Sequence, residues 1–243
     1  MKKLCFLFCM LSLLFSLCSC GGKAAEKQTV QPEGKRTAEE AIESGVLLST
    51  VDLMDEVEKD AESANKTYAG KYYLMNLVVD RLNDPNTVRA GFNIRGSHLS
   101  FIKSVYFTVD LSGEERKDIA YGDVLQVAGK ISNIEKRFNG ATFVEITDAR
   151  IVTKTFQISG EVKKAVHSDN WGYYLVVSDD SGNVFPDSEI RVFLQEEGNY
   201  TEGDRITATG TLIGGLREGT AGASAYAWPF AMDDPERMEI EGP

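Results

Sequence analysis

Cysteine has the most versatile chemistry of the side chains in this sequence, and all four cysteines lie within the first twenty residues. Two lysines follow the first residue, an apolar run spans residues 4–18, and small residues come next. This order is typical of a secretory signal. The run is shorter than the roughly 20 apolar residues that a membrane-spanning helix needs. The sequence therefore predicts export and removal of residues 1–19, which hold three of the four cysteines.

The motif Leu17-Cys18-Ser19-Cys20 follows the apolar run. It resembles the bacterial lipobox, in which an aliphatic residue stands three positions before a cysteine and a small residue directly before it. The resemblance implies cleavage before Cys20, a thioether-linked diacylglycerol on that residue and a further acyl chain on the new amino terminus. Two or three acyl chains, at about 0.8 kcal/mol per buried CH₂, hold a protein on a membrane. We expect a protein that is lipid-anchored to a bacterial cell membrane, at the outer membrane and periplasm or at the cell surface. The alternative is a plain secreted protein.

Little nucleophilic or metal-binding chemistry would remain after this processing. The one cysteine of the mature chain, Cys20, would be acylated, so no thiol is left for a disulfide, a nucleophile or a metal. The two histidines, His98 and His167, each stand beside a serine. A hydrolase with a His-centred site is an alternative, but no nucleophile-elbow motif supports it. We expect no catalytic residue, no metal site and no cofactor.

Aromatic and basic residues offer binding chemistry instead. Trp171, Tyr173 and Tyr174 lie at a predicted turn into a strand, where they could stack on bases or sugars. Neighbouring residues of a strand face opposite sides, so one of the two tyrosines should lie in the core and the other on the surface. Arg89 and Arg95 would contribute to a basic strip. These five residues are the candidate ligand-binding residues.

The charge distribution disfavours nucleic acid as a partner. The full chain has a formal net charge of −11, and loss of the two lysines in the signal makes it more acidic. Residues 154–243 hold seven basic and 16 acidic side chains, whereas residues 68–153 hold 11 and 10. Affinity for nucleic acid grows with the number of phosphates that Lys and Arg neutralise. A nucleic-acid-binding protein is therefore the alternative and not the main expectation.

Periodicity indicates the elements that would position these residues. Residues 20–36 hold almost no large apolar side chain, which predicts a flexible tether. Thr37 with Glu40 fits a capping box, and Gly45 would end that short helix. A second helix, capped by Ser49 or Thr50, is predicted by apolar residues at three- and four-residue steps. These residues are Leu53, Val57, Ala61, Ala64 and Tyr68.

Beyond Gly70 the hydrophobic period changes to two, which predicts strands separated by turns such as the two-residue hairpin turn Asn139-Gly140. The strand pattern then repeats. Aligning Gly122-Asp123 with Gly203-Asp204 brings inward-facing positions of two strands into register. These positions are Leu125, Val127, Gly129 and Ile131 in one strand and Ile206, Ala208, Gly210 and Leu212 in the other. The repeat predicts two small barrels, each with a strand that bends at its glycine.

Residues 48–152 resemble the tRNA-anti-like group of OB-fold proteins. The resemblance rests on a helix with alanines that leads into Tyr68-Ala69-Gly70-Lys71, and on the Gly-Asp turn at residues 122–123. Residues 83–103 depart from the pattern and leave the second strand unassigned. The resemblance implies a five-stranded barrel whose ligand meets the face of strands two and three and the loops after strands one and four. The family name implies nucleic acid, but a fold alone does not fix a function.

The predicted fold is mainly β, with an N-terminal helix followed by two tandem OB-like five-stranded barrels. We expect a lipoprotein signal peptide at 1–19, a flexible tether at 20–36, the helical lead-in with the first barrel at 37–153, and the second barrel at 154–243. The expected function is that of a membrane-anchored, exported, non-catalytic binding or scaffold module. Its expected partner is an envelope protein or a glycan.

Replacing the acylated cysteine should release the protein from the membrane. We predict that Cys20→Ala abolishes both membrane association and labelling by a palmitate analogue, because the acyl chains supply the anchor. The control Cys18→Ala should keep both, since Cys18 leaves with the signal. Label that persists in the Cys20→Ala variant would contradict the lipid assignment.

Overall fold

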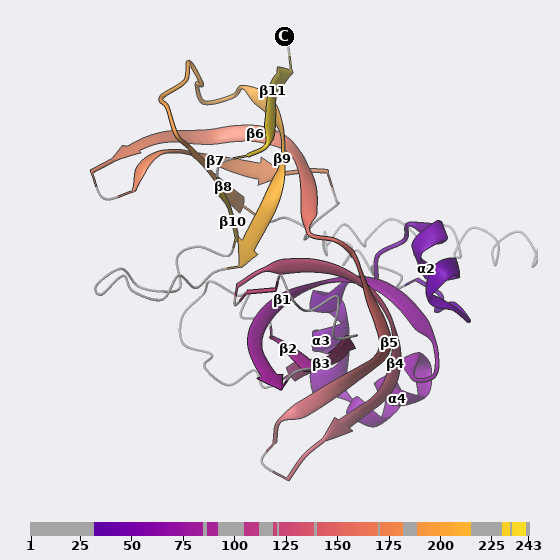
Figure 1. Cartoon of the computed structure of the whole chain (residues 1–243). Helices are drawn as coiled ribbons and strands as arrows, with labels where there is room; N and C mark the ends of the chain where they lie inside the picture. The colour runs from indigo at the N-terminus through magenta and orange to yellow at the C-terminus, as the bar shows by residue number, and fades with distance from the viewer. Residues whose placement is uncertain are drawn as a thin grey trace, which may run out of the picture. The chain divides into compact units, whose positions relative to one another are not determined.

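The computed structural model describes residues 32–84, 87–91, 105–111, 119–120, 122–138, 140–169, 171–181, 189–214, 230–233 and 235–241. Over these residues the protein is mainly β, with two sheets and three short helices (Figure 1). Residues 31–243 form one compact unit. The predicted fold class is therefore confirmed as far as a β-rich protein with two sheets. Cys20 and the residues of the signal lie outside the described residues.

Helix α2 (Ala38–Ser44) has the caps that the sequence predicts. The Thr37 hydroxyl accepts a hydrogen bond from Glu40 N (3.2 Å), and the Glu40 carboxylate accepts one from Arg36 N (3.0 Å). Gly45 ends the helix with a φ of 60°, in the left-handed region that favours glycine. At the other end, Gly45 N donates a hydrogen bond to the Ile42 carbonyl (3.0 Å). The three bonds satisfy backbone groups at both ends of the helix, which helps so short a helix to form.

The prediction of one long second helix is wrong, because α3 (Thr50–Lys59) and α4 (Ala61–Tyr68) are separate helices that meet at Asp60. The backbone of Asp60 is extended, and its carboxylate accepts a hydrogen bond from Ser63 N (3.0 Å). Aspartate is a strong N-cap, and this local bond competes with a continuous helix. The predicted stripe is still buried at Leu53, Val57, Ala64 and Tyr68, and Ala61 is partly buried.

The first sheet is a closed barrel. Its strands are β1 (Tyr72–Asp84), β2 (Thr87–Gly91), β3 (Val105–Leu111), β4 (Val124–Lys136) and β5 (Thr142–Thr153). The order around the ring is β1-β2-β3-β5-β4, with β4 paired to β1. Strands β3 and β5 are parallel, and the other pairs are antiparallel. The second strand, which the sequence left unassigned, is β2.

The hairpin turn between β4 and β5 differs from the predicted two-residue turn. Arg137 N donates to the Ala141 carbonyl (2.7 Å), so three residues lie between these paired positions. Gly140 N donates to the Arg137 carbonyl (2.9 Å), and Gly140 has a φ of 83°. Three-residue hairpin loops commonly carry a left-handed residue in this way. The turn therefore requires glycine at position 140, whereas its backbone does not require phenylalanine at position 138.

The second sheet has six strands where five were predicted. They are β6 (Thr155–Ser168), β7 (Gly172–Asp179), β8 (Glu189–Leu194), β9 (Arg205–Gly214), β10 (Phe230–Asp233) and β11 (Arg237–Glu241). Strand β10 pairs in parallel with β8 and antiparallel with β9, so β6-β7-β8-β10-β9 form a ring in the order of the first barrel. The sixth strand, β11, arises because the chain continues along β9 after β10.

A Gly-Asp turn joins β1 to the start of β4 in the first barrel. Gly122 N donates to the Val79 carbonyl (2.8 Å), and Val79 N donates to the Asp123 carbonyl (2.9 Å). The Asp123 carboxylate also accepts a hydrogen bond from Ala120 N (2.7 Å). Gly122 has a φ of 88°, which most other residues rarely adopt.

The second ring contains the same turn between β6 and β9. Gly203 N donates to the Val162 carbonyl (2.9 Å), and Val162 N donates to the Asp204 carbonyl (2.8 Å). The Asp204 carboxylate accepts a hydrogen bond from Thr201 N (2.7 Å), and Gly203 has a φ of 95°. The repeat detected in the sequence is thus a repeated hydrogen-bonded turn.

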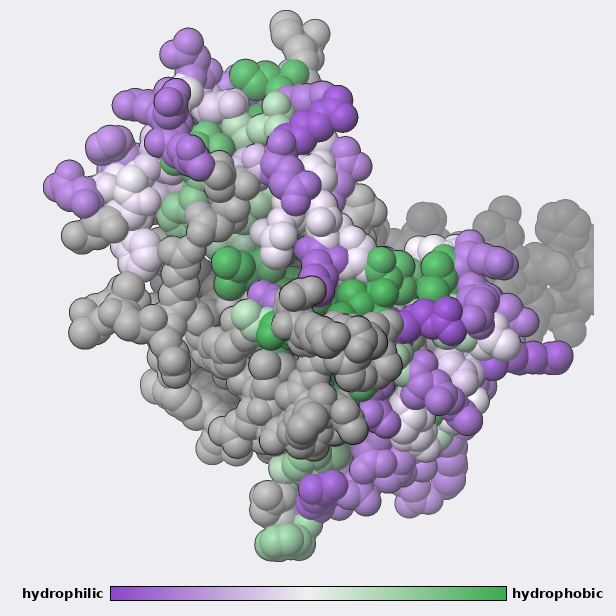
Figure 2. All heavy atoms as spheres, viewed as in Figure 1, coloured by the Kyte–Doolittle hydropathy of each residue, from purple (hydrophilic) through white to green (hydrophobic). Residues whose placement is uncertain are grey.

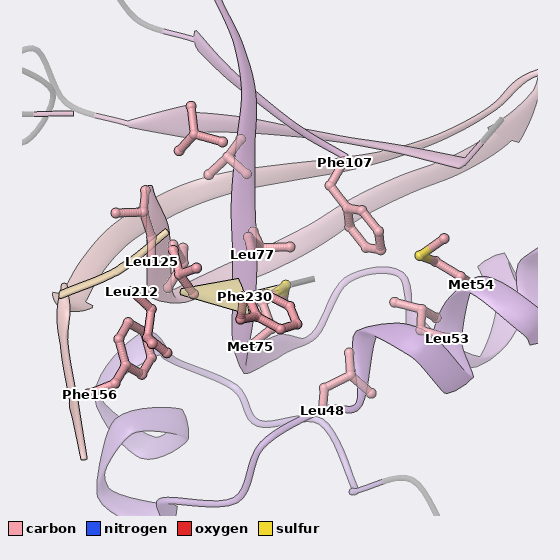
Figure 3. Packing of buried hydrophobic residues seen from close by; sticks show 14 of the residues in the cluster. Leu48, Leu53, Met54, Met75, Leu77, Phe107, Leu125, Phe156, Leu212 and Phe230 are labelled. Carbon is pink, nitrogen blue, oxygen red and sulfur yellow. The ribbon is translucent and has the colours of Figure 1, made fainter. Parts of the chain in front are cut away.

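The apolar core fills the space inside both rings. The inward positions of the repeat are buried, at Leu125, Val127, Ile131, Ile206, Ala208 and Leu212. Figure 3 shows Leu53 of α3, Met75 of β1 and Phe107 of β3 among the packed side chains of this cluster. The cluster includes residues of the second sheet, and Gly214 N donates a hydrogen bond to the Gly122 carbonyl (2.6 Å). Separate folding of the two barrels stays a prediction.

Most of the residues that are coloured by hydropathy in Figure 2 are hydrophilic. Hydrophobic residues lie beside α2 and at the tip of the β4–β5 hairpin. The exposed large hydrophobic residues of the described chain are Val46, Phe138 and Ile240. Within the described residues, no helix has both the length and the apolar character to cross a membrane.

Candidate binding face

The strands β6, β7 and β8 present one face to the core and the other toward solvent. On β7, Tyr173, Leu175 and Val177 are buried, whereas Tyr174 and Val176 are partly exposed. This alternation is the period of two expected for a strand with one buried face. We call the outward side of these three strands the β6–β8 face.

The register of β6, β7 and β8 aligns their outward residues in rows across the strands. One row is apolar, and the row next to it carries two basic residues. Tyr174 lies between Val166 of β6 and Phe193 of β8. In the next row, Val176 lies between Lys164 and Arg191. Residues that are directly opposite on neighbouring strands have side chains about 5 Å apart at Cβ, so each row is a continuous strip.

Aromatic and cation–π contacts connect the two rows. The ring centroids of Tyr174 and Phe193 are 5.2 Å apart with an interplanar angle of 43°. The Arg191 guanidinium carbon lies 5.3 Å from the Tyr174 centroid, within the range of a cation–π contact. Burial lowers the pKa of Arg191, while Tyr174 and Glu189 act to raise it. Arginine stays protonated in proteins, so the group is a fixed cation.

This arrangement suits a ligand that has both a flat or apolar face and an anionic group. The two rings can stack on such a ligand, and stacking is worth about 1–3 kcal/mol per base in nucleic-acid complexes. Arg191 can donate paired hydrogen bonds to a carboxylate or phosphate. Lys164, which is exposed in the same row, adds a second positive charge. The face offers recognition chemistry, with no nucleophile or general base among these residues.

The structure divides the aromatic residues that the sequence singled out. Tyr173 is buried, as one of the two tyrosines was predicted to be, and its hydroxyl donates to the Gly198 carbonyl (3.2 Å). Burial raises the pKa of Tyr173. Tyr174 lies on the β6–β8 face. Trp171 is partly exposed in the turn between β6 and β7. Tyr173 is therefore a core residue, whereas Tyr174 contacts Phe193 and Arg191 on the face.

Of the remaining candidate residues, the structure describes the side chain of His167 alone. Arg89 belongs to β2, where its backbone pairs with Thr108, and its side chain lies outside the described part. Arg95 and His98 also lie outside the described residues, so the predicted basic strip is untested. His167 is exposed on β6, opposite Tyr173. Among the described residues, no group of three or more His, Cys, Asp or Glu side chains could hold a metal ion.

Sequence reasoning missed Arg191 and Phe193. The alternation of residues along β8 puts Ile190 and Val192 on one face and Arg191 and Phe193 on the other. That signal shows which residues share a face of β8. It does not show that β8 pairs with β7 in the register that opposes Phe193 to Tyr174.

Comparison with protein-family models finds no match to this chain. Comparison with curated proteins finds no match either. A function for this chain therefore has to be inferred from its own residues.

Alanine substitutions of Tyr173 and Tyr174 distinguish a core residue from a residue of the β6–β8 face. We predict that Tyr173→Ala costs about 3–5 kcal/mol of unfolding free energy, the range for a buried aromatic residue. Tyr174→Ala should cost about 1 kcal/mol or less, because its ring is only partly buried. Urea unfolding of both variants measures the difference. Equal losses would show that Tyr174 is a core residue.

Proposed function

We propose that this protein is an exported, lipid-anchored binding module that recognises a glycan of the cell envelope through the β6–β8 face. Cys20 would carry the anchor. The tether expected at 20–36 is too long at its end, because Lys35 exchanges two backbone hydrogen bonds with Tyr72 of β1 (both 2.9 Å), so only the residues before Pro32 would let the folded part stand off from the membrane. At about 5–6 Å × √n, a flexible tether of that length reaches on the order of 20 Å. The module is proposed to be non-catalytic.

The strand order supports the proposal that both barrels are OB folds. Each ring runs first, second, third, fifth and fourth strand, and in each the third and fifth strands are parallel. OB folds are five-stranded Greek-key barrels that bind oligonucleotides or oligosaccharides on the face of strands two and three. In the second ring, that face is formed by β7 and β8.

One observation carries the proposed function, namely the packing of Tyr174, Phe193 and Arg191 on β7 and β8. Aromatic rings stack on the apolar faces of sugar rings, and a guanidinium pairs with a sugar carboxylate. The acidic composition of residues 154–243 argues against a polyphosphate chain, because such a ligand meets repulsion along its whole length. A short acidic glycan needs only the local charge of Arg191 and Lys164.

Calorimetric titration with glycan fragments tests the proposal. The mature chain, residues 20–243 with Cys20→Ser, should bind peptidoglycan fragments or uronic-acid oligosaccharides. Tyr174→Ala and Arg191→Ala should each weaken binding by about tenfold or more, as expected for loss of a stacking or charged contact. The control Tyr106→Ala, in the first barrel, should leave the affinity unchanged.

Labelled oligonucleotides provide the opposing test, by fluorescence anisotropy at physiological salt. We expect no binding of single- or double-stranded nucleic acid. Micromolar affinity with a steep dependence on salt, lost in Arg89→Ala or Arg95→Ala, would replace the glycan by nucleic acid. In the calorimetric titration, equal glycan binding by the parent and by the Tyr174→Ala variant would show that the β6–β8 face is not the binding site.

A further inference from the structure

Phe138 is the most exposed large hydrophobic residue of the described chain. Its relative exposure is 104%, whereas Val46 and Ile240 are 53% and 52% exposed. It lies at the tip of the β4–β5 hairpin, where Figure 2 shows a hydrophobic residue projecting from a hydrophilic surround. Transfer of this ring from water to an apolar partner would be favourable.

Contacts along the stem of the hairpin hold its tip in a defined place. Ile134 N donates a hydrogen bond to the side-chain oxygen of Asn65 in α4 (2.8 Å). The Arg137 guanidinium carbon lies 3.8 Å from the centroid of the Phe143 ring. Figure 1 shows the hairpin extending past α4. Phe138 is therefore carried on a braced hairpin that projects from one end of the first barrel.

The charged side chains near the tip leave little charge for recognition. Arg137 forms an ion pair with Glu135 (2.8 Å), and its guanidinium also lies 4.0 Å from the Glu145 carboxylate. Lys136 is exposed beside them. The formal charges of these four side chains cancel. The tip therefore suits a partner that is recognised by apolar contact and not by charge.

The chain enters the first barrel at the end from which this hairpin projects. Lys35 exchanges two backbone hydrogen bonds with Tyr72, the first residue of β1, and Tyr72 pairs with Lys130 of β4. Because β4 is antiparallel to β1, it runs from Lys130 past the start of β1 toward Phe138. At about 3.3 Å per residue, the chain from Lys130 to Phe138 covers roughly 26 Å.

The tether that is expected before Pro32 is long enough to let the tip reach the membrane. At about 3.5 Å per residue, residues 20–31 can extend to about 40 Å. This reach exceeds the roughly 26 Å by which the tip stands beyond the row of Lys35, Tyr72 and Lys130. An anchor at Cys20 would therefore allow this end of the barrel to face the bilayer with the tip in contact.

We propose that Phe138 inserts into the interface of the membrane that anchors this chain, so that the β4–β5 hairpin is a second membrane contact. The inference rests on the proposed lipid anchor, which would keep the tip at a high effective concentration beside the bilayer. Phenylalanine is among the residues that peripheral proteins bury in the membrane interface. A single ring binds weakly, so the contact orients the first barrel on the membrane and does not replace the anchor.

Site-specific fluorescence on vesicles tests this contact. Residues 20–243 with Cys20→Ser are tied to phosphatidylcholine vesicles through an N-terminal histidine tag and a nickel-chelating lipid. This chain has no cysteine, so Lys136→Cys can carry a single environment-sensitive fluorophore close to Phe138. We expect its emission to shift to the blue on anchoring and to be quenched by lipids with brominated acyl chains.

Matched variants separate the phenyl ring from the rest of the surface. Phe138→Ala should abolish both the shift and the quenching, whereas Phe138→Leu should keep them because the side chain stays apolar. Ile240→Ala removes another exposed hydrophobic residue and should change neither signal. A fluorophore on Asp169→Cys, an exposed position after β6, should show neither signal. Added salt should have no effect, because the charges near the tip cancel.

Three results would overturn the proposal. The first is an anchored parent without quenching at position 136, the second is equal quenching in the Phe138→Ala variant, and the third is equal quenching at positions 136 and 169. The histidine tag replaces the acyl chains, so the outcome is independent of the labelling test of Cys20. A quenched tip in a protein whose Cys20 is not acylated would disprove the natural anchor and still support the membrane contact of Phe138.

Discussion

The Gly-Asp turn is the local constraint on which both rings depend. In each ring the turn exchanges two backbone hydrogen bonds with a valine of the first strand, Val79 or Val162, just before the fourth strand begins. The aspartate side chain closes the turn by accepting a bond from the backbone three residues earlier. Only a residue that tolerates positive φ fits beside it, which explains the glycine. The turn sets where the fourth strand starts and so which residues of that strand point inward.

Features encoded by neighbouring residues could be predicted from the sequence. The caps of α2 at Thr37 and Gly45, the repeated Gly-Asp turn and the burial of one tyrosine at 173–174 all follow from local patterns. The buried stripe of α3 and α4 was also visible as spacing. In these cases the physical cause lies within a few residues of its effect, so no knowledge of distant contacts was needed.

Features that depend on competition or on pairing between distant strands could not be predicted. A helix ends at Asp60 because the hydrogen bond from Ser63 N to the Asp60 carboxylate is more stable there than another turn of helix. Hydrophobic periodicity does not show which of these two alternatives is more stable. The β4–β5 loop length depends on the pairing of Arg137 with Ala141. The partnership of Tyr174 with Phe193 and Arg191 requires the register of β7 on β8. The candidate site could therefore be predicted only in part: Tyr174 was identified from the sequence, but its neighbours Phe193 and Arg191 were not.

Amide hydrogen exchange followed by NMR tests the central structural claim, that a Gly-Asp turn fixes the start of the fourth strand in each ring. The amides of Val79 and Gly122 in the first ring, and of Val162 and Gly203 in the second, donate the bonds of the turn. We predict that all four exchange as slowly as amides in the core strands, because they open only when the barrel does. If either pair of amides exchanged as fast as amides of exposed loops, the claim that the turn fixes the fourth strand of that ring would be contradicted.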